Sequence, residues 1–197
     1  MPSEQQRPDV IEQRADFRAR AADWLVNHLK WLDETGVQLN LTREYGRAVP
    51  GQRIIEGVPS NYGSNYTVLA TLGVDGVQAP FVLEGALNGE RFSLYVEKVL
   101  APTLRPGDIL VMDNLPIHKV GGIQQLVEAC GARIEFLSPY SPDFNPIERC
   151  WSKIKTYLRK AKARSYKALL KALKEALATI TEADIRAWAK FCGYSIH

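Results

Sequence analysis

The sequence is poor in the residues that most often mark disulfide frameworks and zinc sites. Its 197 residues include three cysteines and three histidines. Cys130, Cys150 and Cys192 are widely spaced and form no Cys-x-x-Cys pair, which argues against both a disulfide framework and a structural zinc site. We therefore expect each cysteine to be a small apolar residue on a helix face.

Long apolar runs are also missing. No stretch approaches the roughly 18 to 20 apolar residues that span a bilayer, and the first residues are polar without an apolar signal core. Apolar residues nevertheless make up 46% of the chain and charged residues 24%, which is average for a globular protein. We expect one folded domain with a real core, located in the cytosol.

Acidic residues are absent from one long segment. From Arg149 to Lys174 there are ten Lys or Arg and no Asp or Glu, whereas the remainder holds 15 basic and 22 acidic residues. This uneven distribution of charge along the chain predicts a polyanionic partner, although a lysine-rich solvated helix face is the alternative. Because the segment begins beside a candidate catalytic acid, nucleic acid is the favoured interpretation.

The first third of the chain changes character several times. Residues 3–28 are typical of a polar, arginine-rich helix, so we assign residues 1–28 to a leader or linker helix and residues 29–197 to the main domain. The pattern then alternates as in a strand, with a turn expected at 34–36. Residues 43–64 hold many Gly and Pro residues and predict a long, functional loop.

The later pattern alternates strands and helices. Asp75-Gly76 between two β-rich runs predicts a hairpin. Further elements are expected as a helix at 92–100, a buried strand at 108–114, a helix at 123–130, a strand at 133–139, and a helix opened by Asn145-Pro146 with Asn145 as its cap, followed by two more helices. This order predicts an α/β fold with a mixed sheet, flanked by helices and extended by extra C-terminal helices, and it is compatible with the ribonuclease H-like fold.

Three carboxylates stand at element ends. Asp33 and Asp113 each follow an apolar strand segment, and Glu148 lies in the first turn of a helix. If the two strands are neighbours, all three side chains can share one site. Carboxylates about 4 Å apart repel by roughly 4 kcal/mol per pair, so the cluster requires cations. Oxygen ligands select Mg²⁺ or Mn²⁺, and two such ions can activate a hydroxyl and stabilise the leaving oxygen of a phosphodiester.

Each carboxylate also has a simpler explanation. Asp33 could be a turn residue with Glu34 as the reactive neighbour. Asp113-Asn114 could merely close a strand, and Glu148 could be only a favourable acid in a first helical turn. Spacing alone leaves these alternatives open.

Three sequence motifs carry a family resemblance. They are WLDETG at 31–36, LVMDN at 110–114 with His118-Lys119 close behind, and SPYSPDFNPIERCWSKIK at 138–155. From about Trp31 to Tyr194 the chain resembles the catalytic domain of bacterial insertion-sequence transposases of the mariner superfamily, the DDE type. The 34 residues between Asp113 and Glu148 match the spacing of that family.

The resemblance implies a fold and an activity. The fold would be ribonuclease H-like, and Asp33, Asp113 and Glu148 would be a triad that binds two magnesium or manganese ions. The reaction would be hydrolytic cutting at terminal inverted repeats and attack of the freed 3′ hydroxyl on target DNA, usually at TA, by a homodimer on DNA. The loop at 45–48 would contact DNA or a partner subunit. Our candidate DNA-contacting residues are Arg47, Asn114, His118, Lys119, Asn145, Arg149, Lys153 and Lys155, with His118 touching a phosphate or Glu148.

Two departures from the family limit the resemblance. Complete members begin with helix-turn-helix modules, and nothing before Trp31 is long enough to supply them, so we do not expect this chain alone to recognise transposon ends. Leu115-Pro116-Ile117 replaces the small residues expected before His118. The rivals are therefore a truncated, non-catalytic regulator that binds DNA or oligomerises, and a general ribonuclease H-like nuclease.

Overall fold

A computed structural model describes residues 3–60 and 63–196 and contains a five-stranded mixed sheet. Its strands are β1 (Leu29–Gln38), β2 (Asn65–Gly73), β3 (Gly76–Glu84), β4 (Ile109–Met112) and β5 (Arg133–Phe136). The strand order is β3-β2-β1-β4-β5, with the β1–β2 and β2–β3 pairs antiparallel and the β1–β4 and β4–β5 pairs parallel. This is the predicted ribonuclease H-like arrangement.

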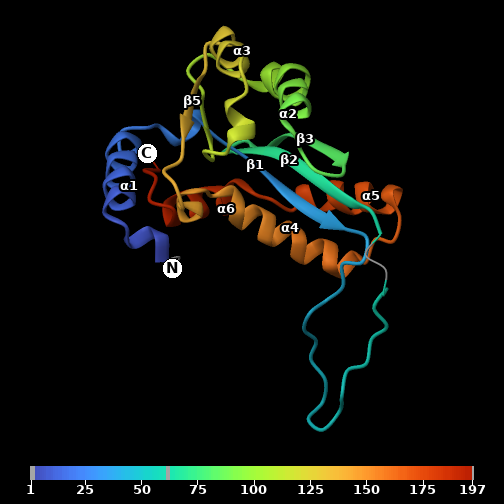
Figure 1. Cartoon of the computed structure of the whole chain (residues 1–197). Coiled ribbons are helices and arrows are strands. Elements are labelled where there is room, and N and C mark those ends of the chain that lie inside the picture. Colours follow the sequence, from blue (N-terminus) through green and yellow to red (C-terminus); the bar gives the residue numbers. More distant parts are fainter. Residues whose placement is uncertain (1–2, 61–62, 197) are drawn as a thin grey trace.

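Helices cover both faces of the sheet (Figure 1). They are α1 (Pro8–Ala21), α2 (Gly89–Tyr95, continued by a π turn at Val96–Leu100), α3 (Ile123–Ala129), α4 (Ile147–Ala161), α5 (Tyr166–Leu177) and α6 (Glu182–Phe191). Because successive strand residues face opposite sides, Leu32 packs with the α2 and α3 cluster whereas Trp31 packs with the α4 to α6 cluster. Within the described chain, no helix is both long and apolar enough to cross a membrane.

Several predicted elements are confirmed. The predicted hairpin between β2 and β3 is present, but its two-residue turn is Val74-Asp75, because Gly76 already pairs with Gly73 as the first residue of β3. Gly76 has a φ of 114°, which favours glycine. All four residues of β4 are buried, as a strand covered on both faces requires. Cys150 is buried in α4, and the other two cysteines are partly buried.

The predicted turn at 34–36 is wrong. β1 runs without interruption to Gln38, because residues 34–38 pair with residues 65–69 of β2. This antiparallel ladder overrides the local turn preference of Glu34-Thr35-Gly36. Asp33 therefore lies inside a long strand, where it faces α4, instead of at a strand end.

The N-terminal helix is shorter than predicted and packs onto the body of the protein. A 3-10 turn at Ser3–Gln6 precedes α1, and another at Val26–His28 follows it. Four apolar residues of this segment are buried, namely Val10, Phe17, Ala21 and Trp24, whereas Ile11 and Leu25 are exposed. The ring of Phe17 stacks on Phe144 with 5.6 Å between centroids, so α1 contacts the segment that precedes α4.

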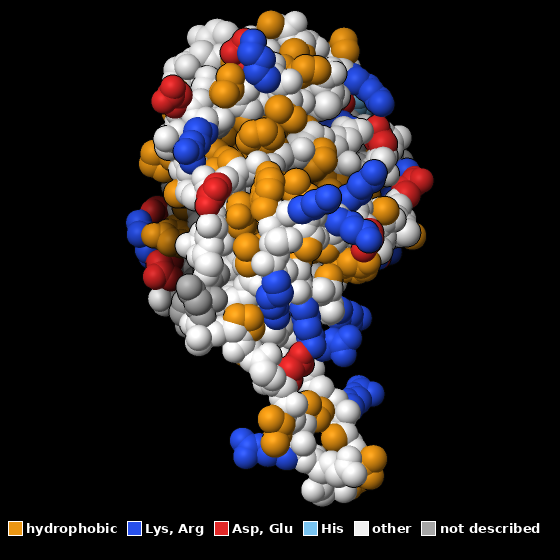
Figure 2. Space-filling view, turned by 90° about the vertical axis from the view of Figure 1, so that its right-hand side faces the viewer, with side chains coloured by type: hydrophobic (Ala, Val, Ile, Leu, Met, Phe, Trp, Pro, Cys, Tyr) orange, Lys and Arg blue, Asp and Glu red, His pale blue; other side chains and the backbone are white. Residues whose placement is uncertain are grey.

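Residues 39–64 contain no helix or strand in their described part, as predicted for the loop at 43–64. This loop projects away from the body, and Lys and Arg side chains lie on it and around its base (Figure 2). The Arg164 guanidinium donates to the carbonyls of Leu39 and Leu41, each at 2.8 Å. Arg159 pairs with Glu44 at 2.8 Å, so the basic end of α4 holds the base of the loop.

Candidate active site

The structure brings Asp33, Asp113 and Glu148 to one cavity of about 480 Å³. β1 and β4 are parallel neighbours with Trp31 opposite Val111, so Asp33 and Asp113 each lie two residues beyond the last pair. Glu148 reaches the cavity from the first turn of α4, which packs against β1. Three residues distant in sequence thus line a common space beside the middle of β1 and the C-terminal end of β4.

Asp33 is the most buried of the three carboxylates. Its side chain is 9% exposed, and its Oδ2 accepts a hydrogen bond from Trp151 Nε1 at 3.2 Å. Burial, reinforced by the negative charges of Glu148, Glu34 and Asp113, raises the pKa of Asp33 to about 8. The ionised form of Asp33 is therefore unfavourable in the cavity, and a bound cation would stabilise it.

Asp113 is held by a buried histidine. His118 Nδ1 lies 2.5 Å from Asp113 Oδ1, and His118 Nε2 lies 3.3 Å from Glu34 Oε2. Burial acts to lower the pKa of His118, but the two carboxylates outweigh burial and raise the pKa to about 9. His118 is 1% exposed and packs on the ring of Phe92 at 4.5 Å. The imidazolium thus bridges β1 and the end of β4.

The contacts of His118 differ from the expected ones. Sequence reasoning placed it near a phosphate or Glu148, whereas the structure places it between Asp113 and Glu34. The sequence suggested Glu34 only as a replacement for Asp33, and the role of Trp151 as a hydrogen-bond donor to Asp33 was not predicted. Residues Asp33 and Glu34 face opposite sides of β1, a signal that the wrongly predicted turn concealed.

Glu148 is the exposed member of the triad. Partial desolvation in the cavity raises its pKa, the charge of Lys155 opposes that effect, and the charges of Asp113 and Glu34 add to it. Lys155 therefore lies where a cation stabilises the ionised form of Glu148.

The predicted side-chain cap at Asn145 is wrong. The N-cap of α4 is Pro146, and no side chain caps this helix end. A 3-10 turn at Pro142–Phe144 leads directly into the helix, and the Asn145 backbone is extended between the two. Asn145 instead lines the acidic cavity. Its side chain is 3% exposed, and Oδ1 has no hydrogen-bond partner among the described residues.

The donors around the cavity suit a hard divalent cation, because carboxylate and carboxamide oxygens line it without thiolates. In residues 3–60 and 63–196, however, no three His, Cys, Asp or Glu side chains are arranged closely enough to hold a metal ion. Asp113 is occupied by His118 instead. The donor set fits the ion, and the carboxylates would have to close around it.

The remaining sequence-predicted residues are spread along the edge of this cavity and beyond it. Asn114 lines the cavity and is exposed. The Lys119 ammonium lies 5.4 Å from the centre of the Phe136 ring, beside a neighbouring hollow. Arg47 is exposed on the projecting loop, away from the carboxylates.

Arg149 and Lys153 face a hollow between α4 and α6. Lys153 donates to Asp184 at 2.7 Å and to the Thr179 carbonyl at 2.9 Å, so its charge is largely engaged. The Arg149 guanidinium lies 3.5 Å from the centre of the Phe191 ring. These two cations thus lie beside α6, whereas Lys155 is the cation whose charge acts on Glu148.

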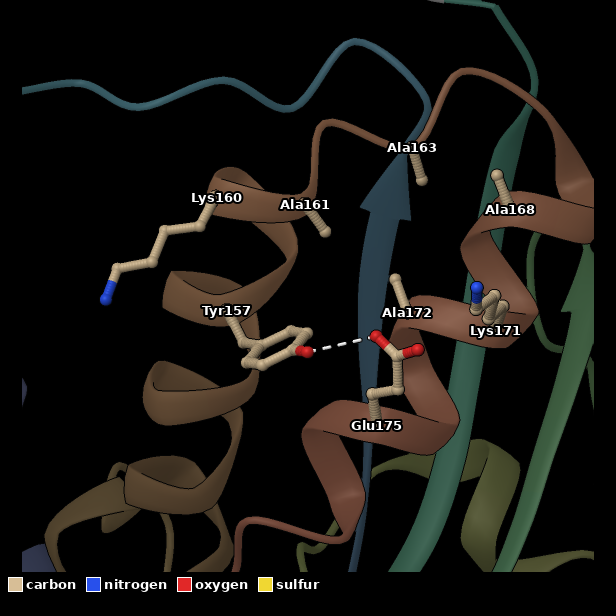
Figure 3. A pocket seen from close by; sticks show the side chains of 8 residues that line it. All are labelled: Tyr157, Lys160, Ala161, Ala163, Ala168, Lys171, Ala172 and Glu175. Carbon is tan, nitrogen blue, oxygen red and sulfur yellow. Dashed lines mark hydrogen bonds between the residues drawn. The ribbon is translucent and has the colours of Figure 1, made fainter.

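Another hollow lies between α4 and α5 (Figure 3). Its floor consists of alanines, and the Tyr157 hydroxyl donates to Glu175 across it at 3.0 Å. Tyr157 is nine residues along α4 from Glu148, or about 14 Å at the rise of an α-helix. Among the described residues that line this hollow, Glu175 is the only carboxylate, so the hollow lacks the grouped carboxylates that line the acidic cavity.

The fold matches solved mariner structures. The pre-cleavage Mos1 transpososome aligns with a TM-score of 0.73 and 16% identity over 100% of this chain and 65% of that chain. The mariner Mos1 paired end complex with Mg aligns at 0.72 and 19%, over 98% of this chain and 62% of that one. The Mos1 transposase catalytic domain with Raltegravir and Mg aligns at 0.71 and 15%, over 94% and 92%. This chain therefore spans just under two thirds of the longer Mos1 chains and nearly all of their catalytic domain.

Sequence comparison supports the same relationship. No curated protein sequence matches the chain. The family model described as DDE superfamily endonuclease matches residues 28–170, a span that includes Asp33, Asp113 and Glu148. Because that span is most of the sequence, the chain belongs to the DDE superfamily endonuclease family.

Proposed function

We propose that this chain is the catalytic part of a bacterial insertion-sequence transposase, which cuts DNA at transposon ends and transfers the cut strand into target DNA. One observation carries the proposal: Asp33, Asp113 and Glu148 line one cavity in a member of the DDE superfamily endonucleases. Residues 29–197 would form the catalytic domain, and residues 1–28 a leader that packs against it.

The proposed cofactor is a pair of Mg²⁺ or Mn²⁺ ions held by Asp33, Asp113 and Glu148. Structures of the related Mos1 complex with Mg and with Mn support this choice. Bound ions would activate the attacking hydroxyl and stabilise the leaving oxygen. The chain's own contribution is positioning: Trp151 Nε1 fixes one oxygen of Asp33, and His118 fixes Asp113.

The proposed partner is double-stranded DNA, bound by a homodimer within the bacterial nucleoid. Mos1 has been solved as a paired-end complex with a transposon end and as a strand transfer complex. Cations beside the cavity would bind phosphates without reading sequence. Lys155 is the best placed for this role because its charge acts on Glu148. The other proposed contacts are Arg47, Asn114, His118, Lys119, Asn145, Arg149 and Lys153.

Nicking of supercoiled duplex DNA tests the proposal. We expect nicking with Mg²⁺ or Mn²⁺, none with EDTA, and none from Asp113→Asn or Asp113→Ala. Asp16→Ala removes an exposed carboxylate on α1 and serves as the matched control, which should cut normally. Circular dichroism of each variant separates lost chemistry from lost folding.

The same assay decides between the rivals. Metal-independent DNA binding without cutting at any protein concentration would replace the proposal with a regulator. Cutting without joining, and with preference for RNA-containing duplexes, would replace it with a general nuclease.

A further inference from the structure

The acidic cavity has a second wall of different chemistry. Besides the carboxylates, Leu115, Leu137, Pro139, Tyr140 and Pro142 line it, and four of these five come from the segment between β5 and α4. Tyr140 is 48% exposed, and no aromatic ring packs on it within the described residues. An uncovered aromatic side chain beside an acidic centre offers a flat apolar surface that a ligand can cover.

The same cavity contains an unsatisfied acceptor. Asn145 Oδ1 is buried, and no donor among the described residues reaches it. Buried polar atoms nearly always have partners, since desolvating one without a hydrogen bond is costly. A donor group on a ligand in this cavity would satisfy Asn145.

The wall is braced from behind by the N-terminal segment, which lies beside the connection from β5 to α4 (Figure 1). Arg14 donates to Ser141 Oγ at 2.8 Å and to both carboxylate oxygens of Asp143, at 3.0 and 2.7 Å. Gln5 Nε2 donates to the Tyr140 carbonyl at 2.6 Å. The Arg14 guanidinium also lies 4.2 Å from the centre of the Phe144 ring.

The contacts of Gln5 and Arg14 lie at a residue with an unfavourable backbone conformation. Tyr140 has a φ of +55°, a left-handed conformation that residues with a side chain rarely adopt. Such residues persist where surrounding contacts over-determine them, and they cluster at ligand sites. Gln5 and Arg14 both donate to the Tyr140 carbonyl, and Arg14 also donates to Ser141, so the backbone that carries the Tyr140 side chain is held in place. The wall is therefore preformed.

We propose that this wall is a subsite for the nucleotide next to the scissile phosphodiester, with Tyr140 stacking on its base and Asn145 accepting a hydrogen bond from the exocyclic amine of that base. Arg14 is a positioning residue that holds the wall. The inference rests on the proposed function, because it takes DNA as the substrate. Adenine, cytosine and guanine carry an exocyclic amine and thymine does not, so the subsite discriminates against a terminal thymine.

Direct binding tests the subsite without relying on cutting. The probes are short blunt duplexes that differ only in the 3′-terminal base, which is adenine, thymine, or unsubstituted purine (adenine without its exocyclic amine). Ca²⁺ replaces Mg²⁺ so that binding is measured without cutting. For the unaltered chain we expect binding to weaken about tenfold when adenine is replaced by purine, the order expected when a buried acceptor loses its donor. Asn145→Leu, similar in shape, should bind adenine and purine ends equally.

Tyr140 and Arg14 are tested on the same duplexes. Tyr140→Phe should retain affinity because the ring remains, whereas Tyr140→Ala should lose it for all ends. Tyr157→Phe, in the hollow between α4 and α5, is the control and should bind normally. Arg14→Gln should weaken base discrimination and speed amide exchange in residues 138–145 while β2 amides keep their protection, and Arg14→Lys should restore part of the discrimination.

The outcomes separate the subsite from the proposed function. Equal binding of adenine and purine ends by the unaltered chain overturns the subsite, even if the protein nicks DNA. A base-independent loss in Asn145→Leu also overturns it, because Asn145 would then bind the attacking hydroxyl instead of the base. Base-dependent binding by a chain that never cuts DNA supports the subsite and removes the transposase proposal.

Discussion

His118 Nδ1 lies 2.5 Å from Asp113 Oδ1, which makes a buried imidazolium the immediate neighbour of a proposed metal ligand. The other ring nitrogen faces Glu34 at 3.3 Å, so one cation is shared by carboxylates from β1 and from the end of β4. Asp33, by contrast, has an indole donor, and no cation pairs with it among the residues that the structure describes. The two aspartates of the site are therefore held by different means.

The charge on His118 should make stability depend on pH. Its folded pKa of about 9 exceeds the ordinary value near 6.5, so its contribution is complete below pH 6.5 and is lost as pH rises through 9. We expect His118→Gln to lower the free energy of unfolding by about 1–3 kcal/mol at pH 6, with a smaller deficit at pH 10.

Urea denaturation from pH 6 to pH 10 measures this deficit. His28→Gln, at an exposed position, is the matched control and should show little change at any pH. A His118→Gln deficit that stays constant or grows with pH would show that the imidazole is not a shared cation.

Trp151 should matter for cation binding as well as packing. Trp151→Phe keeps a buried ring but removes the donor to Asp33 Oδ2, so the carboxylate loses its fixed orientation. We expect Mn²⁺ affinity to fall roughly tenfold, the effect usual for partners that orient ligands. Trp188→Phe, in the hollow between α4 and α6, is the control. Equal Mn²⁺ titrations for Trp151→Phe and the unaltered chain would remove Trp151 from the site.

Much of the fold could be predicted because its signals are local. The hairpin follows from Asp75-Gly76 between two β-rich runs, and β4 follows from a short apolar run. The start of α6 is marked locally as well, because Thr181 and Asp184 form a capping box. β1 was mispredicted because its last residues are fixed by pairing with β2, a long-range contact that outweighs the local turn preference.

Less of the candidate site than of the fold could be predicted from the sequence. The motifs pointed to Asp33, Asp113 and Glu148, which the structure places around one cavity, but they did not predict that His118 would bridge Asp113 and Glu34. Asn145 satisfies every local rule for a cap, yet the preceding 3-10 turn directs its side chain into the cavity. Likewise, the polar composition of α1 conceals Arg14, whose partners lie about 127 residues later in the chain.

Lys155 should account for part of the salt dependence of DNA binding. One phosphate contact contributes about 0.9 to the slope of log K against log salt concentration. We expect Lys155→Ala to reduce the slope by about 1 and to weaken binding equally for all DNA sequences. Lys98→Ala, on the helical segment after α2, removes a similar exposed charge and should leave the slope unchanged. An unaltered slope in Lys155→Ala would place DNA elsewhere.

Anomalous diffraction from crystals grown with Mn²⁺ tests the central claim most directly, because it locates the metal independently of any activity. The account predicts Mn²⁺ in the acidic cavity, with carboxylate oxygens of Asp33 and Asp113 about 2.0–2.2 Å away and Glu148 completing the shell. Well-occupied Mn²⁺ bound elsewhere, or none in the cavity at saturating concentration while His118 still holds Asp113, would contradict it.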